Sequence, residues 1–314
     1  MILPTYDDVI DAANRISRHV HHTPVFTSAY FDRRVGASVH FKAENLQKVG
    51  AFKARGAMNA VLSLTDEDAS RGVVTHSSGN HGQALANAAR VRGIAATIVM
   101  PHHAPAVKVA AVRGYGATIV FCDQAEREAI LTEVQAESGA TLVHPFDDAA
   151  VIAGQGTASL EFVAQVPDLD VIVAPIGGGG LLSGASIVGD YAGVDVVGAE
   201  PDVVDDSYRS LRDGVRHPAT GASSIGDGLL TGIGELTFAV LHAASRTVVT
   251  VSDEEMLDAM GTVASRMKLV IEPSSGAAVA AILKYSDAFH AKRVGVILSG
   301  GNVQLSVLGG LPAT

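Results

Sequence analysis

The segment VIVAPIGGGGLLSGA, residues 171–185, decides the fold. An apolar run, four glycines and a second apolar run predict a buried strand, a tight turn and the start of a helix. Glycines let a ligand approach the backbone N–H groups closely, and the start of a helix adds partial positive charge. The turn therefore favours a phosphate ligand, although a flexible turn without a ligand explains a glycine run equally well. The spacing matches neither the dinucleotide fingerprint nor a P-loop, so the phosphate belongs to something other than NAD or ATP.

Length and pattern predict a large α/β protein. The chain has 314 residues, of which 47% are hydrophobic, and this is enough for two domains or one large one. Strand-like runs alternate with helical runs nearly throughout, which predicts crossover units and parallel sheets. We expect strands at residues 39–42, 72–76, 96–100, 117–121, 141–144, 171–176, 194–199, 247–251 and 294–299, and helices at residues 56–64, 82–92, 105–115 and 127–138.

Composition excludes several classes of protein. A formal net charge of −10 argues against a nucleic-acid partner, because a phosphate backbone needs a basic face. No apolar stretch is long enough for a membrane helix, and the first residues do not form a secretory signal. The single cysteine, Cys122, is typical of a reducing compartment. We therefore expect a cytoplasmic protein whose partner is a small molecule.

Three more segments bring reactive side chains to turns before predicted helices. Each has an ordinary explanation: Lys53 as a surface lysine, Ser77 and Asn80 as helix caps, and Ser299 as a turn residue. Ligands of open parallel sheets bind at the carboxyl ends of the strands, so we expect these turns to meet the glycine run. Together they supply an amine, a phosphate site and a neutral hydroxyl, which is the set that pyridoxal phosphate needs. The segments are VGAFKARGA (49–57), THSSGNHGQ (75–83) and LSGGN (298–302).

In this order the four segments resemble the fold-type II pyridoxal-phosphate enzymes, specifically the threonine/serine dehydratase and serine racemase group. The resemblance covers essentially the whole chain. It implies a tryptophan synthase β-like α/β fold with two open parallel-sheet domains and the cofactor in the cleft between them. It also implies a large cofactor-binding domain, residues 1–71 and 148–314, and a small mobile domain, residues 72–147.

The resemblance implies a role for each cofactor-binding residue. Lys53 carries the Schiff base, Phe52 packs against the cofactor, Asn80 contacts the ring hydroxyl and Ser299 faces the pyridine nitrogen. A neutral serine leaves that nitrogen unprotonated, which suits elimination of a β leaving group. The resemblance further implies that the phosphate is bound by the glycine loop, which consists of Gly177, Gly178, Gly179 and Gly180.

The loop Ser77-Ser78-Gly79 resembles the serine-racemase-like branch of the group. The resemblance implies that Lys53 is the base on one face of the substrate and Ser78 the base on the other. It implies β-elimination of L-serine or L-threonine to a keto acid and ammonia, with or without serine racemase activity. The substrate contacts implied are Ser77, Ser78, Asn80, His81 and Arg127.

The identity of the substrate depends on the role of Arg127, for which the sequence allows two interpretations. Its guanidinium would bind the second carboxylate of 3-hydroxyaspartate, which makes a 3-hydroxyaspartate ammonia-lyase the alternative. A helix-surface arginine is an equal interpretation. A β-replacement synthase on the same fold and a non-catalytic amino-acid-binding module are further alternatives, and both rank behind the ammonia-lyase.

The resemblance also implies accessory sites. Glu200, Val204 and Asp206 map onto the branch's divalent-cation loop, and oxygen ligands suit magnesium or calcium. An acidic surface loop is the alternative. The group is usually dimeric, so we expect a homodimer. Residues similar to those of a nucleotide site allow ATP as an activator, although each has an ordinary structural explanation; they are Gln83, Tyr115, Lys268 and Asn302.

Overall fold

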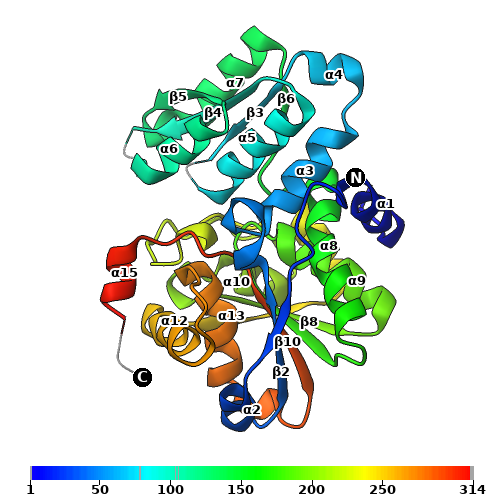
Figure 1. The fold of residues 1–314 in the computed structure, drawn as a ribbon, viewed down its shortest axis with the longest axis vertical. Helices are drawn as coiled ribbons and strands as arrows, with labels where there is room; N and C mark the ends of the chain where they lie inside the picture. Colours follow the sequence, from blue (N-terminus) through cyan, green and yellow to red (C-terminus); the bar gives the residue numbers. More distant parts are fainter. Residues whose placement is uncertain (1, 78, 103, 105, 312–314) are drawn as a thin grey trace.

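Two separate sheets organise the chain in the computed structural model, which describes residues 2–77, 79–102, 104 and 106–311. Figure 1 shows two lobes, one above the other, each built around one sheet. The α/β class with parallel sheets is confirmed. The strands are β1 (Val25–Thr27), β2 (Ser38–Ala43), β3 (Val73–His76), β4 (Ala96–Pro101), β5 (Thr118–Cys122), β6 (Thr141–Leu142), β7 (Val171–Pro175), β8 (Asp195–Pro201), β9 (Thr247–Val251) and β10 (Arg293–Leu298).

The larger sheet has the order β1-β2-β10-β7-β8-β9, and the smaller sheet has the order β5-β4-β3-β6. Every pairing is parallel except that of β1 with β2. Each predicted strand is present, although the strand predicted at residues 141–144 ends at Leu142. The short edge strand β1 was not predicted, because three residues are too few to show the alternation of apolar and polar side chains that indicates a strand.

Helices cover both faces of the parallel strands, which explains the apolar runs in the sequence. All residues of β3 and β7 are buried, as expected for strands covered on two sides. The helices are α1 (Tyr6–Ile16), α2 (Ala29–Val35), α3 (Lys53–Ser63), α4 (Asp66–Ser70), α5 (Asn80–Arg92), α6 (Ala106–Gly114), α7 (Arg127–Ser138), α8 (Ala149–Gln165), α9 (Gly180–Ala192), α10 (Asp206–Asp213), α11 (Glu235–Ala243), α12 (Asp253–Met267), α13 (Pro273–Lys284), α14 (Ser286–Phe289) and α15 (Leu305–Gly309), with 3₁₀ turns η1 (Glu44–Leu46), η2 (Lys48–Gly50), η3 (Gln124–Glu126), η4 (Asp202–Val204) and η5 (Asp227–Leu229).

One predicted turn is wrong. Residues 49–57 do not follow a strand directly, because η1 and η2 separate them from β2, and Lys53 is the first residue of α3 instead of a loop residue. The segment reaches the carboxyl end of β10 by backbone pairing. The Phe52 N–H donates to the Ser299 carbonyl at 2.9 Å, and the Gly301 N–H donates to the Gly50 carbonyl at 2.9 Å.

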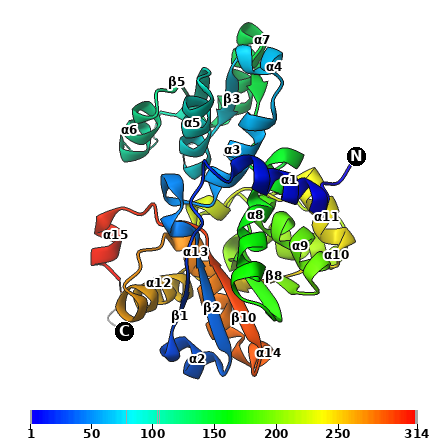
Figure 2. The same ribbon diagram turned by 45° about the vertical axis from the view of Figure 1, so that its right-hand side comes forward.

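Each sheet contains a topological switch point, at which the loops that leave neighbouring strands run in opposite directions. In the larger sheet β7 lies between β8 and β10, and in the smaller sheet β3 lies between β4 and β6. Loops that leave neighbouring strands at such points diverge and open a crevice at the carboxyl ends of the strands. Figures 1 and 2 show α3 where the two lobes meet, and it packs on α5 of the upper lobe and on α8 of the lower one.

A buried ion-pair network fixes the start of α3. The Arg55 guanidinium pairs with Glu44 of η1 at 2.7 Å and with Glu161 of α8 at 2.7 Å. Glu161 also accepts from the Lys42 ammonium at 2.7 Å. The side chains of Lys42, Arg55 and Glu44 are 0% exposed and that of Glu161 is 18% exposed, so two cations and two carboxylates balance one another with little access to water. Breaking such a set by removing one member leaves an uncompensated charge.

None of the helices in the described part of the chain combines the length and the apolar character that crossing a bilayer would require.

We predict that Arg55→Met destabilises the protein strongly. The substitution removes the cationic partner of the Glu44 carboxylate, which is fully buried. The free energy of unfolding, measured by urea denaturation, should therefore fall by about 3–5 kcal/mol. Arg71→Ala is the control, because Arg71 also pairs with two carboxylates, Glu67 and Asp68, but at the surface. The control loss should stay below about 1 kcal/mol. Equal losses in both variants would contradict a structural role for burial.

Candidate active site

A cavity of about 450 Å³ lies between the two lobes, at the carboxyl ends of β3, β7 and β10. Its size suits a small organic molecule. The structure brings most of the predicted site residues to its wall. Those that line it are Phe52, Lys53, Ser77, Asn80, His81, Arg127, Gly177, Gly178, Gly179, Gly180 and Ser299. Ser78 lies outside the described residues.

In the part of the chain that the structure describes, five helices begin at this cavity. They are α3, α5, α7, α9 and α13, and the first residue of each of the first four lines the wall, as do Glu272 and Ser274 at the start of α13. The N-terminal end of a helix carries partial positive charge and free N–H groups. Such ends make the cavity a favourable place for the anionic groups of a ligand.

The glycine turn after β7 fits a phosphate. Its residues are buried, yet in the part of the chain that the structure describes no acceptor meets the N–H groups of Gly177, Gly178 or Gly179. A Cβ at Gly178 would lie 2.3 Å from the ring of Phe146. Gly179 has a φ of 94°, a conformation that favours glycine. The turn therefore presents unpaired donors that only a glycine backbone can bring so close to its neighbours.

Lys53 places its amine in the cavity. Nζ donates a hydrogen bond to the Pro145 carbonyl at 2.6 Å. Burial lowers the pKa of this amine to about 8, and the Glu272 carboxylate acts in the opposite direction. The positive end of α3, of which Lys53 is the first residue, also disfavours the ammonium form. An amine with this pKa is partly neutral near pH 7 and is therefore a usable nucleophile and base.

Glu272 is a site residue to which the sequence assigned no role. Its carboxylate accepts two hydrogen bonds from Nδ2 of Asn80, at 2.9 and 3.1 Å, and burial raises its pKa to about 7. The other side of the Asn80 amide accepts from Nδ2 of Asn302 at 2.9 Å. Glu272 precedes Pro273, the first residue of α13. A glutamate directly before a proline that opens a helix is the signal that locates it at a helix start.

Ser299 presents a neutral hydroxyl. It is 2% exposed, and its Oγ lies 3.0 Å from Oγ of Ser275. Ser275 Oγ in turn donates to the Gly300 carbonyl at 2.8 Å. Among the described residues no charged side chain is hydrogen-bonded to Ser299, so whatever it contacts in the cavity meets an uncharged group.

Ser77 and His81 frame the start of α5. Ser77 Oγ accepts from the Gly79 N–H at 3.2 Å. His81 donates from Nε2 to the Val143 carbonyl at 3.0 Å, and its buried Nδ1 has no partner in the described part of the chain. Burial, with the nearby Lys53 amine, lowers the pKa of His81 well below its usual value. His81 is therefore a neutral imidazole at physiological pH.

Arg127 is the first residue of α7 and lines the cavity. Its side chain is 25% exposed, and one of its Nη atoms lies 3.8 Å from the Glu128 carboxylate. Its Nε is buried and has no hydrogen-bond acceptor among the residues described. A buried guanidinium N–H without an acceptor is costly, which favours a ligand that supplies one.

The predicted metal ligands lie away from the cavity wall, at the end of β8 and the start of α10. Glu200 accepts from the Tyr208 N–H at 2.5 Å, and Asp206 accepts from the Ile233 N–H at 3.1 Å. Burial raises the pKa of Glu200 to about 8 and raises that of Asp206. Neither is in an ion pair with a described residue. Val204 is buried in η4. Within the described ranges, no three or more His, Cys, Asp or Glu side chains form a group able to hold a metal.

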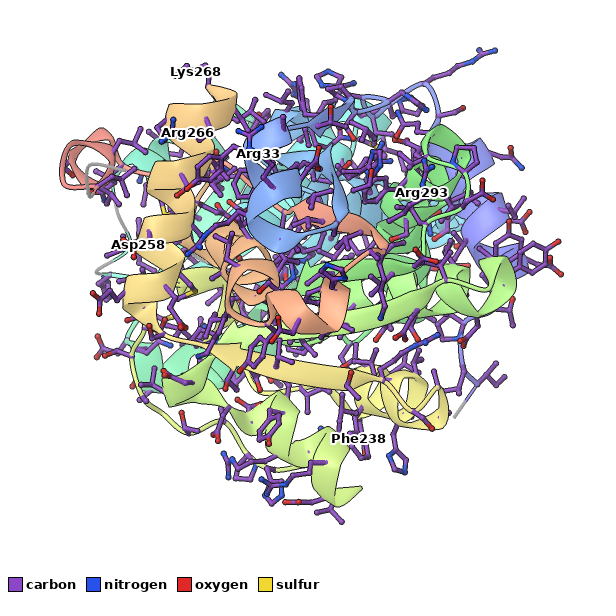
Figure 3. The ribbon with its side chains drawn as sticks, turned by 90° about the horizontal axis from the view of Figure 1, so that it is seen from below. Arg33, Phe238, Asp258, Arg266, Lys268 and Arg293 are labelled. Atoms are coloured by element: carbon purple, nitrogen blue, oxygen red, sulfur yellow. The ribbon has the colours of Figure 1, made fainter. Side chains whose placement is uncertain are left out.

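The residues similar to a nucleotide site are spread over different surroundings. Gln83 is buried in α5, and Tyr115 stacks against Arg90. Asn302 is bonded to Asn80 at the cavity and to the Val49 carbonyl. Figure 3, seen from below, places Lys268 at the outer end of α12, beyond Arg266. Lys268 therefore lies on the outer surface.

Comparison with known proteins gives one consistent result. The sequence pattern of the family described as "Pyridoxal-phosphate dependent enzyme" matches residues 16–300. A serine racemase of Dictyostelium discoideum is 47% identical, over 98% of this chain and 97% of its own. A beta-hydroxyaspartate dehydratase of Paracoccus denitrificans is 45% identical, over 98% of this chain and 99% of its own. The crystal structure of a serine racemase from Dictyostelium discoideum superimposes with a TM-score of 0.92 at 46% identity, and covers 96% of this chain and 99% of that one.

We predict that the Glu272 carboxylate raises the pKa of Lys53 above the value that burial alone would give. In the full-length protein freed of cofactor, modification of Lys53 by an amine-reactive reagent should have its midpoint near pH 8, read by mass spectrometry of the peptide. Glu272→Gln should lower the midpoint, because the lost carboxylate favoured the ammonium form. Glu255→Gln, which removes the partner of the surface residue Lys284, should leave it unchanged. An unchanged midpoint in Glu272→Gln would contradict the coupling.

Proposed function

Because this chain belongs to the pyridoxal-phosphate dependent enzymes, we propose that it eliminates the β-hydroxyl of an amino acid such as L-serine or L-threonine, releasing a keto acid and ammonia. One observation carries the proposal. The Lys53 amine, with its pKa lowered to about 8, shares a cavity with a glycine turn whose N–H groups have no acceptor in the described part of the chain. The names of two relatives, a serine racemase and a beta-hydroxyaspartate dehydratase, support a hydroxy amino acid as the substrate.

The residues of the cavity suit pyridoxal phosphate. When bound, this cofactor supplies an aldehyde that links to an amine and a ring that withdraws electrons from the α-carbon of the substrate. Lys53 would hold the aldehyde, Ser299 the ring nitrogen and Asn80 the ring hydroxyl. Phe52 would pack against the ring. The unpaired N–H groups of the turn, Gly177–Gly180 with the start of α9, would hold the phosphate.

The chain's own residues would then bind the substrate and move its protons. Ser77, Asn80 and the N-terminal end of α5 suit the α-carboxylate. Neutral Lys53 would accept the α-proton at Nζ and pass it to the β-hydroxyl, which departs as water while the electron pair left on Cα becomes the second bond between Cα and Cβ. The released enamine would tautomerise to an imine, and water would hydrolyse that imine to the keto acid and ammonia. The Pro145 carbonyl, 2.6 Å from Nζ, and the Glu272 carboxylate favour the ammonium that results. Ser78 remains our proposal for the base on the opposite face, and exchange of the α-proton there would racemise the substrate.

We predict that Lys53→Ala abolishes the activity. The wild-type protein loaded with cofactor should absorb near the visible edge and release keto acid from a panel of serine, threonine and 3-hydroxyaspartate. The variant should lose the band and the keto acid, because no other amine replaces Nζ. Lys292→Ala, at an exposed position, is the control and should keep both. A wild-type spectrum in Lys53→Ala would refute the proposal.

A specific observation favours a second candidate, a 3-hydroxyaspartate ammonia-lyase. The buried Nε of Arg127 has no acceptor among the described residues, and the side chain lines the cavity. A substrate with a second carboxylate would supply that acceptor. The name of the Paracoccus denitrificans relative supports the same substrate class. Such an enzyme would use the same Lys53 chemistry and differ only in this contact.

We predict that Arg127→Gln separates the two substrate classes. If Arg127 binds the second carboxylate, kcat/KM for 3-hydroxyaspartate should fall by about 30-fold, the effect of losing a hydrogen bond to a charged group. Turnover of serine, which has no second carboxylate, should remain within about threefold of the wild-type value, and serine thus serves as the internal control. Equal losses on both substrates would show that Arg127 acts on the site as a whole.

We also propose a divalent cation, magnesium or calcium, at Glu200, Asp206 and the Val204 carbonyl. Two buried carboxylates, neither of them in an ion pair with a described residue, support it. Oxygen donors of this kind suit hard cations. Burial raises the pKa values of both carboxyl groups, although the Arg209 guanidinium acts in the opposite direction on Asp206.

Further parts of the proposal concern mobility and assembly. We infer that residues 72–147 move as a small domain against residues 1–71 and 148–314. The confinement of β3–β6 to residues 73–142 supports this. A homodimer is proposed from the resemblance alone. Activation by ATP is likewise proposed from the resemblance alone, and Lys268 lies on the outer surface. A cytoplasmic location is supported by the single, unpaired Cys122.

A further inference from the structure

Residues 144–147 join the two lobes at the cavity. They follow β6 of the smaller sheet and precede α8 of the larger lobe. His144 packs edge-on against His76 of β3, with 6.0 Å between the ring centroids. Phe146 reaches the other way, onto the glycine turn. A segment that contacts both lobes beside Lys53 can fix the geometry of the lysine.

Asp147 anchors this segment to a distant helix. Its Oδ1 accepts from the N–H groups of Leu236 and Thr237 at 2.8 and 3.1 Å, and its Oδ2 accepts from that of Glu235 at 2.9 Å. These are the first three residues of α11. The residue that precedes them, Gly234, has no side chain to cap the helix, and a Cβ there would lie 2.3 Å from Oδ1 of Asp147. The carboxylate of Asp147 therefore takes the place of the missing cap.

The neighbouring Asp148 also caps a helix, in this case the one that directly follows it in the sequence. Its Oδ1 accepts from the Val151 N–H at 2.9 Å and caps α8, the helix that begins at the next residue. Two adjacent aspartates thus cap two helices. Only the cap by Asp147 ties the segment to another part of the chain.

A histidine closes the turn from its other end. Nδ1 of His144 accepts from the Asp147 N–H at 2.8 Å. This bond requires an unprotonated Nδ1, and burial lowers the pKa of His144, which keeps the ring neutral. The backbone between His144 and Asp147 is therefore held at both ends.

The groups held between these ends face the reacting lysine and the glycine turn. The Pro145 carbonyl accepts from Nζ of Lys53 at 2.6 Å. Thr237, whose N–H bonds Asp147, also donates from Oγ1 to the Gly178 carbonyl at 2.7 Å. The start of α11 thus holds Asp147 and the glycine turn in one arrangement.

We propose that Asp147 is a positioning residue for Lys53. Through its cap on α11 it holds the Pro145 carbonyl where the lysine amine is received whenever that amine is free. The inference rests on the proposed function, because only turnover at Lys53 frees and recaptures the amine. The carbonyl engages one N–H of the amine, limits its motion and favours its charged form.

The test measures the Lys53 amine itself. The full-length protein is freed of cofactor and treated at pH 7 with an amine-reactive reagent, and modification of Lys53 is followed by mass spectrometry. Asp147→Ala should be modified at least fivefold faster than the wild type, because the amine loses its fixed acceptor. Asp147→Asn keeps an oxygen for two of the three N–H groups and should give an intermediate rate. Asp148→Ala removes a cap of the same kind and should match the wild type.

The exposed Lys292 reports the reagent's intrinsic rate and should not change. Equal Lys53 rates in Asp147→Ala and Asp148→Ala would overturn the inference. Should Asp147→Ala not fold, Asp147→Asn against Asp148→Asn makes the same comparison, and equal rates there would overturn it too. Failure of the proposed function is seen separately, as a wild-type protein that releases no keto acid after cofactor is added.

Discussion

The ion pairs of Arg55 are the constraint on which the site depends. Arg55 lies two residues after Lys53 on the same helix, and its guanidinium is bonded to Glu44 and Glu161 with no exposure to water. These bonds fix the first turn of α3 against η1 and α8, so the direction of the Lys53 side chain follows from them. A buried network of this kind adds little net stability compared with apolar packing, but it has one satisfied arrangement. We see it as the element that sets position.

The cavity combines two opposed electrostatic demands. The helix N-termini at its wall favour anions, as a phosphate and a carboxylate require. The same field and burial disfavour the ammonium of Lys53, whose pKa falls to about 8. A site arranged for anionic ligands therefore also makes its lysine a better base. Glu272, itself with a pKa raised to about 7, limits the effect because its negative charge favours the ammonium form.

Sequence patterns predicted the strands other than β1, and three of the four cavity-lining turns, because both kinds of feature are local. An apolar run such as residues 171–176 needs no knowledge of the fold to indicate a buried strand. The start of α3 was misplaced because η1 and η2 interpose without a period of their own. The roles of Glu272 and Asp147 had no local signal. Glu272 acts on Asn80, 192 residues away, and Asp147 on Glu235, 88 residues away. Such contacts depend on how the two lobes pack.

Asp147 and Asp148 make this difference concrete. Both are aspartates at the start of a helix, and the rules of capping apply equally to both. The rule accounts for Asp148, whose partner is three residues ahead. The rule does not predict the contact of Asp147 with α11, because the helix start that lacks a capping side chain, at Gly234, belongs to another part of the chain. A glycine at an N-cap position has no side chain that could accept from the first N–H groups of the helix, so a residue of another segment can accept from them instead. The segment that carries this residue is then held against the start of the helix. Where that segment also carries the acceptor of a reactive lysine, helix capping becomes part of the active site.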